Sequence, residues 1–408
     1  MKRLAIPAAA ALLLSATACG SGFEDQQAQP QQQTGGPAAL QVLIASSGAA
    51  ETEAVEQAAD TWAKATGNTA KVTPAQDINQ QLGQAFAGGT PPDVFYVDAS
   101  RFADYASVGA LEPYGDKISD GQDFYPSLRQ TFTYDGKFYC APKDFSTLAL
   151  VVNDDLWKRN ELTDDEIPTT WDELTAVTKK IKGVTPLAVT DAWDRLGVFM
   201  VQAGGWITSE DATQATGDSP QNLQALQYVK GLLTGKQAQY ARALDAGWAG
   251  EAFGKGQAAM TIEGNWIKGA MKADFPDVKF SVHELPAGPA GKGTLSFTNC
   301  WGIAAKSANK AAAISFVEAM TKTDQQMAFA EAFGVMPSRQ SAKDAYLKEF
   351  PADAAFVGGA EYARGPVNAP KMDSVLSDFN AGLQQLATQD PKTILARLQK
   401  NTESALGG

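Results

Sequence analysis

Mostly apolar runs and amphipathic segments alternate along residues 40–98. Residues 40–46 (LQVLIAS) have the length and composition of a buried strand. In the next segment, apolar residues recur at helical spacing, at Val55, Ala58, Ala59 and Trp62. The alternation continues through 69–75, 77–89 and 91–98. This part of the chain is therefore predicted to run strand, helix, strand, helix, strand.

This order of elements favours an α/β fold. Strands separated by helices pair in parallel, and the helices pack on the faces of the sheet. In such sheets a ligand binds at the carboxyl ends of the strands. The ends available here are residues 46–51 (SSGAAE) and 96–101 (YVDASR). The second stretch combines an aromatic ring, a carboxylate, a hydroxyl and a guanidinium.

The stretch 253–266 (FGKGQAAMTIEGNW) contains the G-x-G-x-x-A spacing of a dinucleotide-binding turn. In a Rossmann turn the glycines follow a strand and open a helix, whereas here they precede the apolar run 258–262. We therefore interpret the stretch as the end of a helix followed by a core strand. Asn265 and Trp266 then lie at the carboxyl end of that strand, where a ligand would bind.

Composition narrows the class of function. The formal net charge is −12, and removal of Lys2 and Arg3 with an N-terminal signal changes it to −14. An acidic chain without a basic stripe argues against a nucleic-acid partner. A body of roughly 370 residues exceeds one hydrophobic core and predicts two domains. The single histidine, His283, excludes a site with two histidine ligands, and no metal or cofactor site is predicted.

The N-terminus carries an export signal. Lys2 and Arg3 precede fifteen uncharged, mostly apolar residues, 4–18. The last residues of this run are small, and Cys19 follows directly after them. This pattern predicts a signal peptide at 1–18, too short for a stable membrane span. The sequence before Cys19 resembles a bacterial lipobox, with Ala16 where leucine is more common, so lipidation of Cys19 is predicted. An ordinary secretion signal is the alternative.

Residues 19–39 follow the predicted cut site and are rich in Gln, Gly and Pro. Such a composition does not bury enough apolar surface to offset the entropy of ordering, so a disordered tether behind the lipidated cysteine is predicted. The protein is thereby expected to be exported and held on the outer side of the cytoplasmic membrane.

Seven motifs occur in an order known from one family. They read FYCAPKDFSTLALVVN, PTTWDEL, QAGGW, FGKGQAAMTIEGNW, LPAGPAGKG, WGIAAKSANKAAAISFVEAMT and FGVMPSR. On these motifs the chain from about residue 40 to 405 resembles the extracellular solute-binding proteins of carbohydrate ABC transporters, the group that includes maltose-binding protein.

The resemblance implies a two-lobed α/β flytrap like the periplasmic binding proteins, each lobe a mainly parallel sheet flanked by helices. The expected first lobe comprises 40–145 plus 299–337, and the second 146–298 plus 338–408. The chain is expected to cross between them near Asp144, near Asn299 and after Met336. Such a protein is not an enzyme and has no cofactor. It binds a carbohydrate in the cleft as a monomer and delivers it to ABC transporter permease subunits.

The resemblance also suggests ligand-binding residues, since aromatic rings stack on sugar rings and polar groups bond sugar hydroxyls. In the first lobe the candidates are Tyr96, Asp98, Ser100 and Arg101. At the first crossing they are Asp144 and Ser146, and in the second lobe Trp193, Asp194, Asn265 and Trp266. At the return crossing they are Asn299 and Trp301, followed by Met336.

Five of these candidates have a structural alternative. Asp98 suits a helix cap, and Arg101 suits an ion pair with Asp104. Trp193, Trp266 and Trp301 suit packing in the core.

Cys140 and Cys300 remain after the cysteine of the lipobox. In an exported protein such a pair favours a disulfide over a metal site. In the family that the chain resembles, the crossing strands flanked by these cysteines run side by side, which implies that Cys140 and Cys300 are bonded to each other.

Other functions are compatible with parts of the sequence. A secreted glycosidase also presents carboxylates and tryptophans in a groove, but no glycosidase motif is recognisable. A surface sensor or adhesion module uses the same flytrap. Within the binding family, glycerophosphodiesters and polyamines are alternative ligands, and the sequence leaves these open.

Overall fold

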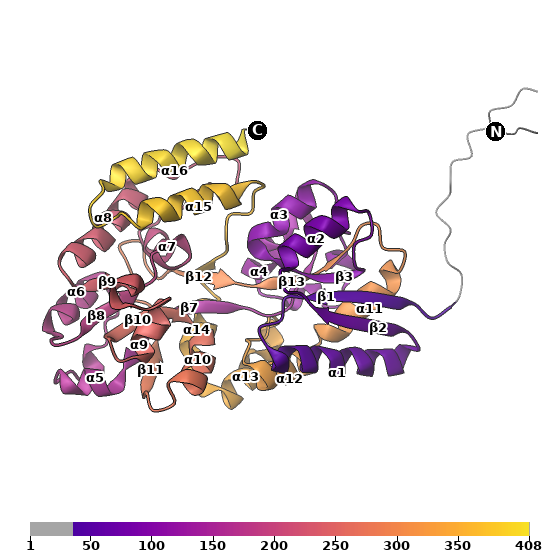
Figure 1. Cartoon of the computed structure of the whole chain (residues 1–408), viewed down its shortest axis with the longest axis horizontal. Coiled ribbons are helices and arrows are strands. Elements are labelled where there is room, and N and C mark those ends of the chain that lie inside the picture. The colour runs from indigo at the N-terminus through magenta and orange to yellow at the C-terminus, as the bar shows by residue number, and fades with distance from the viewer. Residues whose placement is uncertain (1–35, 408) are drawn as a thin grey trace, which may run out of the picture. The chain divides into compact units, whose positions relative to one another are not determined.

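Two large mixed β-sheets, each flanked by helices, organise residues 36–407, the part of the chain that the computed structural model describes (Figure 1). We call the body around the five-stranded sheet the first lobe and the body around the seven-stranded sheet the second lobe. Separate hydrophobic clusters of buried residues underlie the two sheets. The two-lobed α/β fold expected from the sequence is thus confirmed.

The sheet of the first lobe has the strand order β2-β1-β3-β13-β6. Its strands are β1 (Ala39–Ile44), β2 (Thr69–Pro74), β3 (Val94–Asp98), β6 (Ala141–Pro142) and β13 (Asn299–Ile303). β1 is parallel to both β2 and β3, as expected for strands joined by helices.

Six helices surround this sheet. They are α1 (Ala49–Thr66), α2 (Ile78–Ala87), α3 (Ala99–Ser107), α4 (Pro126–Thr131), α11 (Lys310–Met320) and α12 (Thr323–Phe333). A small hairpin of β4 (Thr133–Tyr134) and β5 (Lys137–Phe138) follows α4. The apolar stripe predicted on α1 is buried, and Gly67 ends the helix in the left-handed conformation, at φ 75°.

The sheet of the second lobe has the order β14-β12-β7-β10-β8-β9, with β11 also paired to β7. Its strands are β7 (Ser146–Asn153), β8 (Thr185–Val189), β9 (Ala238–Tyr240), β10 (Ala258–Gly264), β11 (Phe280–His283), β12 (Thr294–Phe297) and β14 (Ala363–Arg364). All residues of β7, β8 and β10 are buried, because helices cover both faces of these central strands.

The remaining helices come after β7 along the chain. They are α5 (Asp154–Arg159), α6 (Trp171–Lys180), α7 (Trp193–Gln202), α8 (Pro220–Thr234), α9 (Ala249–Gly254), α10 (Trp266–Asp274), α13 (Lys343–Glu349), α14 (Ala354–Gly359), α15 (Met372–Leu383) and α16 (Pro391–Leu406). α15 and α16 lie side by side along one edge of the second lobe (Figure 1).

The chain passes from one sheet to the other through short segments. Residues 143–145 join β6 of the first sheet to β7 of the second, and Thr298 joins β12 of the second sheet to β13 of the first. A backbone bridge between Phe145 and Met336 ties the first passage to the segment after α12. We call these residues the hinge.

The two connections between the lobes explain why both sheets are mixed, whereas mainly parallel sheets were expected. β13 enters the first sheet at the edge formed by the carboxyl ends of its parallel strands, where Asn299 pairs with Asp98 at the end of β3, so β13 runs antiparallel to β3. β7 likewise begins at the hinge and is antiparallel to β10. A strand that arrives from the other lobe has to enter from the cleft side, which reverses its direction, and both sheets are therefore mixed.

The expected disulfide between Cys140 and Cys300 is present, with 5.6 Å between the two Cα atoms. Both residues are fully buried in the core of the first lobe. Within residues 36–407, no helix has both the length and the apolar character needed to cross a membrane. The predicted signal peptide at 1–18 and lipidation site Cys19 lie outside the described residues.

Candidate functional site

A cleft of about 420 Å³ lies where the two sheets meet. The first lobe contributes the start of α3, at Asp98 and Ser100. The second lobe contributes the start of α7, at Trp193 and Asp194, together with β12 and one face of α15. Four of the expected ligand residues are thus brought together from strand ends that are almost one hundred positions apart in sequence.

On the first-lobe side, Asp98 has two roles. Its carboxylate accepts a hydrogen bond from the Ser100 backbone N–H at 2.8 Å, so Asp98 caps α3 as the structural alternative anticipated. The Asp98 side chain is nevertheless exposed to the cleft. Capping holds the carboxylate and the adjacent Ser100 hydroxyl in fixed positions in the cleft wall.

On the second-lobe side, α7 begins with an aromatic ring and a carboxylate. The Trp193 backbone N–H donates to Asn380 Oδ1 on α15 at 2.7 Å, which fixes the start of the helix. The Trp193 ring is half-buried, with its edge towards Trp206 at a centroid distance of 6.3 Å. Part of the ring is therefore free to contact a ligand in the cleft.

Two buried oxygens in the cleft wall have no hydrogen-bond partner among the described residues. They are Asp194 Oδ1 and the Oγ of Ser296, a residue that is only 5% exposed. Buried polar atoms are nearly always paired, since leaving one unpaired costs about 1–3 kcal/mol. Both residues line the cleft, so a bound ligand with hydroxyl groups would satisfy them.

Arg101 does not line the cleft, but its ion-pair partner Asp373 does. Its guanidinium forms an ion pair with Asp373 of α15 in the second lobe and lies 3.7 Å from Asp104, the partner anticipated from the sequence. The Lys371 backbone N–H also donates to Asp104 at 2.8 Å. These contacts join α3 to the start of α15, so Arg101 connects the two lobes across the cleft.

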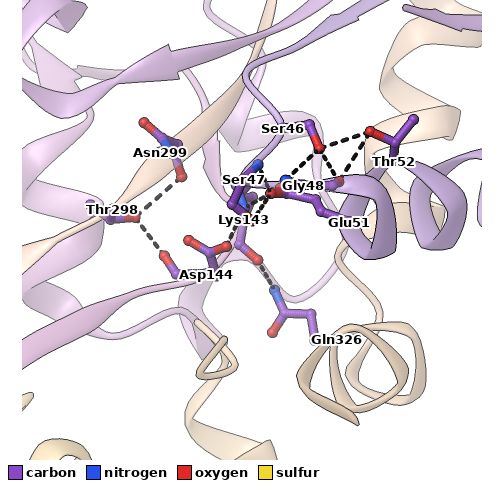
Figure 2. A network of polar contacts seen from close by, with 10 residues as sticks. All are labelled: Ser46, Ser47, Gly48, Glu51, Thr52, Lys143, Asp144, Thr298, Asn299 and Gln326. Atoms are coloured by element: carbon purple, nitrogen blue, oxygen red, sulfur yellow. Dashed lines mark hydrogen bonds and ion pairs between the residues drawn. The ribbon is translucent and has the colours of Figure 1, made fainter. Parts of the chain in front are cut away.

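A buried polar network occupies the hinge (Figure 2). Lys143 Nζ donates to Glu51 Oε1 at 3.0 Å and also to the Asp144 carboxylate. Ser47, after the end of β1, donates to Glu51 through both its N–H and its hydroxyl. Thr298 donates to the Asp144 carbonyl at 2.6 Å, so the network connects the first two passages between the lobes.

The charges in this network are set by burial and by the central lysine. Burial pushes the pKa of Glu51 up, but Lys143 and the bonds from Ser47 leave it lower than usual. Burial raises the pKa of Asp144, and Lys143 offsets this only in part. Burial lowers the pKa of Lys143, but its two carboxylate partners leave it raised, so the ammonium stays charged.

Several expected ligand residues therefore support the hinge. Asp144 is 8% exposed and bonded to Lys143. Ser146 Oγ accepts from the Asn265 backbone N–H at 3.1 Å, and Asn265 Nδ2 donates to the Gly334 carbonyl of the first lobe at 2.9 Å. Asn299 is half-buried at the start of β13, within the same network.

Trp266 covers a second buried ion pair. Arg195 Nε lies 3.0 Å from Glu263, whose side chain is fully buried, and Trp266 Nε1 donates to the same carboxylate oxygen at 3.0 Å. The Arg195 guanidinium also lies 4.9 Å from the Trp266 ring and 3.3 Å from Asp194. Burial raises the pKa of Glu263, against the opposing effect of Arg195. Through Arg195 this pair orients the Asp194 carboxylate in the cleft.

Three expected ligand residues lie in the core. Trp301 is 1% exposed and packs between Tyr96 and Phe316. Tyr96 is 2% exposed and Met336 is fully buried. None of the three lines the cleft, and for Trp301 the alternative of core packing describes its position.

Sequence reasoning missed the groups that hold the site together. Lys143, Glu51, Arg195 and Glu263 are charged residues in buried ion pairs. Their local sequence carries no sign of burial, because the partners are 92 and 68 positions apart. The cleft residues Ser296, Arg364, Asp373 and Asn380 were also missed. Of these, Ser296 was detectable as a polar residue close to the crossing expected near Asn299.

Among residues 36–407 there is no group of His, Cys, Asp and Glu side chains arranged to hold a metal ion. The cleft instead offers carboxylates, hydroxyls, one amide, one guanidinium and one indole ring. Such a set binds a polar ligand by hydrogen bonds and ring stacking.

Comparisons with known proteins agree with this architecture. The model of a family described as "Bacterial extracellular solute-binding protein" matches residues 57–357. The maltotriose-binding protein of Pyrococcus abyssi is 26% identical over 349 residues, which cover 81% of this chain and 73% of that protein. The diacetylchitobiose binding protein DasA of Streptomyces coelicolor is 23% identical over 355 residues, covering 84% and 83%.

A solved structure shares the fold across nearly the whole chain. The cyclic alpha-maltosyl-1,6-maltose binding protein from Arthrobacter globiformis superposes with a TM-score of 0.83 at 23% sequence identity. The match covers 91% of this chain and all of that one.

Proposed function

The chain belongs to the bacterial extracellular solute-binding protein family, and on this premise we propose that it captures a carbohydrate between its lobes and delivers it to an ABC importer. The observation that carries the proposal is the composition of the 420 Å³ cleft, where Trp193, Asp98, Asp194 and Ser296 converge from both lobes. Its role is binding rather than catalysis.

These residue types match the surface of a sugar. A sugar ring has an apolar C–H face, on which an indole ring stacks, and a belt of hydroxyls that both donate and accept. Stacking contributes about 0.5–1.5 kcal/mol beyond the area buried, and each hydrogen bond about 0.5–3 kcal/mol. The unpartnered oxygens of Asp194 and Ser296 supply acceptors that such hydroxyls would fill.

The relatives support the ligand class. The Pyrococcus, Streptomyces and Arthrobacter proteins are named for binding saccharides, although their ligands differ from one another. We therefore propose a carbohydrate as the class and leave the individual sugar to experiment.

Anchoring to the membrane is part of the proposal. The lipobox-like sequence at Cys19 and the polar tether behind it would hold the binding domain close to its permease. Detergent phase partition of the full chain tests this. Wild-type protein is expected in the detergent phase and Cys19→Ala in the aqueous phase, whereas equal partition would show that Cys19 carries no lipid. Light scattering is expected to report a monomer.

A binding screen tests the ligand. The domain from residue 37 onward is titrated calorimetrically with neutral mono- and oligosaccharides, glycerophosphodiesters and polyamines. A ligand at about 100 times its Kd stabilises the fold by about 2.7 kcal/mol, which gives a parallel thermal-shift readout. Binding of a saccharide supports the proposal. Binding only of a phosphodiester or a polyamine would replace the ligand class, and binding of none would favour a sensor or adhesion module.

Two variants link the ligand to the cleft. Trp193→Ala removes the stacking surface, and Asp194→Asn keeps the shape of the side chain but removes its charge. Each is expected to weaken saccharide binding about tenfold, the equivalent of one lost stacking contact for Trp193→Ala and of one lost charge-assisted hydrogen bond for Asp194→Asn. Asp165→Asn, an exposed carboxylate of the second lobe outside the cleft, is the matched control and is expected to bind as wild type.

A further inference from the structure

A second cavity of about 840 Å³ lies between the lobes, beside the cleft. The first lobe contributes the end of α3, α4 and β4, and the second lobe contributes residues 206–212, the loop 362–371 and the end of α16. None of the ligand residues expected from the sequence lines this cavity.

The second cavity adjoins the cleft. Arg364 and Pro366 line both, so the cleft and the second cavity adjoin at the loop 362–371. Typical small-molecule sites measure about 300–1,000 Å³. The cleft alone meets that size, and the added cavity exceeds what a monosaccharide or disaccharide needs.

Arg364 lies at the junction with its donors uncommitted. Its guanidinium lies 5.2 Å from the Trp206 ring, and within the described part of the chain its side chain forms no ion pair or hydrogen bond. Arginine stacked on an aromatic ring keeps its in-plane N–H groups free to donate.

The walls of the second cavity have the chemistry of a saccharide site. Tyr134 and Tyr362 supply aromatic surface, and Asn368 Oδ1 is a buried acceptor without a partner in the described chain. Asn368 itself is fixed, because its Nδ2 donates to the Thr133 carbonyl at 2.6 Å.

The charges around the second cavity favour a neutral ligand. Asp135, Glu210 and Asp211 line it against the cations Arg364 and Lys371, so an anionic ligand meets a net negative wall. Hydroxyl groups, in contrast, are able to donate to these carboxylates and to Asn368.

We infer that the ligand is a neutral oligosaccharide longer than a disaccharide, whose chain passes Arg364 and continues into the second cavity. This inference rests on the proposed function and adds the length of the ligand and a set of contacts. The sugar units beyond the cleft lie against Tyr134 and donate to Asn368.

Calorimetric titration with malto- and chito-oligosaccharide series, from mono- to hexasaccharide, tests the inference. In wild-type protein the Kd is expected to fall from the disaccharide to the tetrasaccharide. Asn368→Ala and Tyr134→Leu are each expected to weaken binding of the tetrasaccharide about two- to tenfold, the effect of one lost hydrogen bond or stacking contact, and to leave the disaccharide unchanged.

Tyr105→Leu is the matched control, since Tyr105 is a partly buried tyrosine of α3 that lines neither cavity. It is expected to bind both lengths as wild type. The ratio of the two dissociation constants separates contact with the ligand from a general loss of stability, which changes both lengths together.

A constant Kd from disaccharide to hexasaccharide overturns the inference and leaves carbohydrate binding intact. The same holds if Asn368→Ala and Tyr134→Leu weaken every length equally. If no saccharide of any length binds, the proposed function fails and the inference fails with it.

Discussion

The disulfide between Cys140 and Cys300 permits a quantitative test of the fold. Cys300 lies in β13, which pairs with β6 immediately after Cys140. The two cysteines are 160 positions apart, and the chain between them includes β7 to β12, most of the second lobe. The bond therefore joins the outgoing and returning strands of that excursion.

The expected stabilisation follows from the length of the closed loop. In the chain-entropy relation, a loop of this length corresponds to about 5 kcal/mol at room temperature, since an unfolded chain with the bond has far fewer conformations. Reducing the bond leaves the sulfur atoms in the core, so reduction tests this entropy without creating a cavity. Cys140→Ala with Cys300→Ala adds a modest packing loss to the same effect.

Urea denaturation with and without reductant measures the difference. The unfolding free energy of wild type is expected to fall by about 5 kcal/mol on reduction, whereas that of the double alanine variant stays the same. A fall below about 2 kcal/mol, with reduction verified by thiol titration, would refute the chain-entropy reasoning for this protein.

The same bond is expected to have little effect on ligand affinity. Both cysteines lie in the core of the first lobe, so the bond does not cross the cleft or restrain the second lobe directly. A saccharide Kd that changed more than about threefold on reduction, roughly 0.6 kcal/mol, would show that the disulfide influences the hinge.

Three further predictions concern charged groups. Arg195→Met leaves the buried Glu263 without a counter-charge and is expected to lower the free energy of unfolding by about 3–5 kcal/mol, measured by urea denaturation. Adding Glu263→Gln is expected to restore most of this loss. Full stability of the Arg195→Met variant would contradict the role of the pair. Burial holds the pKa of His283 below its ordinary value of 6.5 despite nearby acids. As the pH falls, this side chain is therefore protonated in the unfolded chain before it is protonated in the folded chain, and the free energy of unfolding decreases below about pH 6.5. His283→Gln is expected to remove this slope, and an NMR titration giving a pKa above 6.5 would refute it. Asp373→Asn breaks a partly exposed ion pair with Arg101 and is expected to change the free energy of unfolding by less than about 1 kcal/mol. It is also expected to increase the radius of gyration of the ligand-free protein in small-angle scattering. An unchanged radius would show that the pair does not hold the lobes together.

Local features of the sequence predicted the elements well, because short-range physics decides them. The stripe at Val55 and Trp62 is the buried face of α1. At the start of α6 the Thr170 side chain accepts a hydrogen bond from the Glu173 backbone N–H, and at the start of α16 Asp390 accepts one from the Lys392 backbone N–H. Caps and apolar periodicity involve neighbours within about one helical turn, so they are legible without knowledge of the fold.

The candidate site was predictable only where a strand ends at the cleft. Asp98, Ser100, Trp193 and Asp194 follow the ends of β3 and β8 and line the cleft. Trp301 was proposed by the same reasoning, yet it lies in the core of the first lobe. Which face of a strand meets the core depends on the neighbouring strands and helices, and local sequence does not contain that information.

The sequence by itself predicted the alternation of strands and helices along residues 40–98, and its resemblance to one family implied the two-lobed fold and the pairing of Cys140 with Cys300. Only the tertiary structure decided that Lys143 and Glu263 are buried in ion pairs and that Arg364 joins two cavities. The physical reason is distance along the chain. Caps and apolar stripes arise from neighbouring residues, whereas a buried charge or a shared cavity wall requires partners that the folded chain alone brings together.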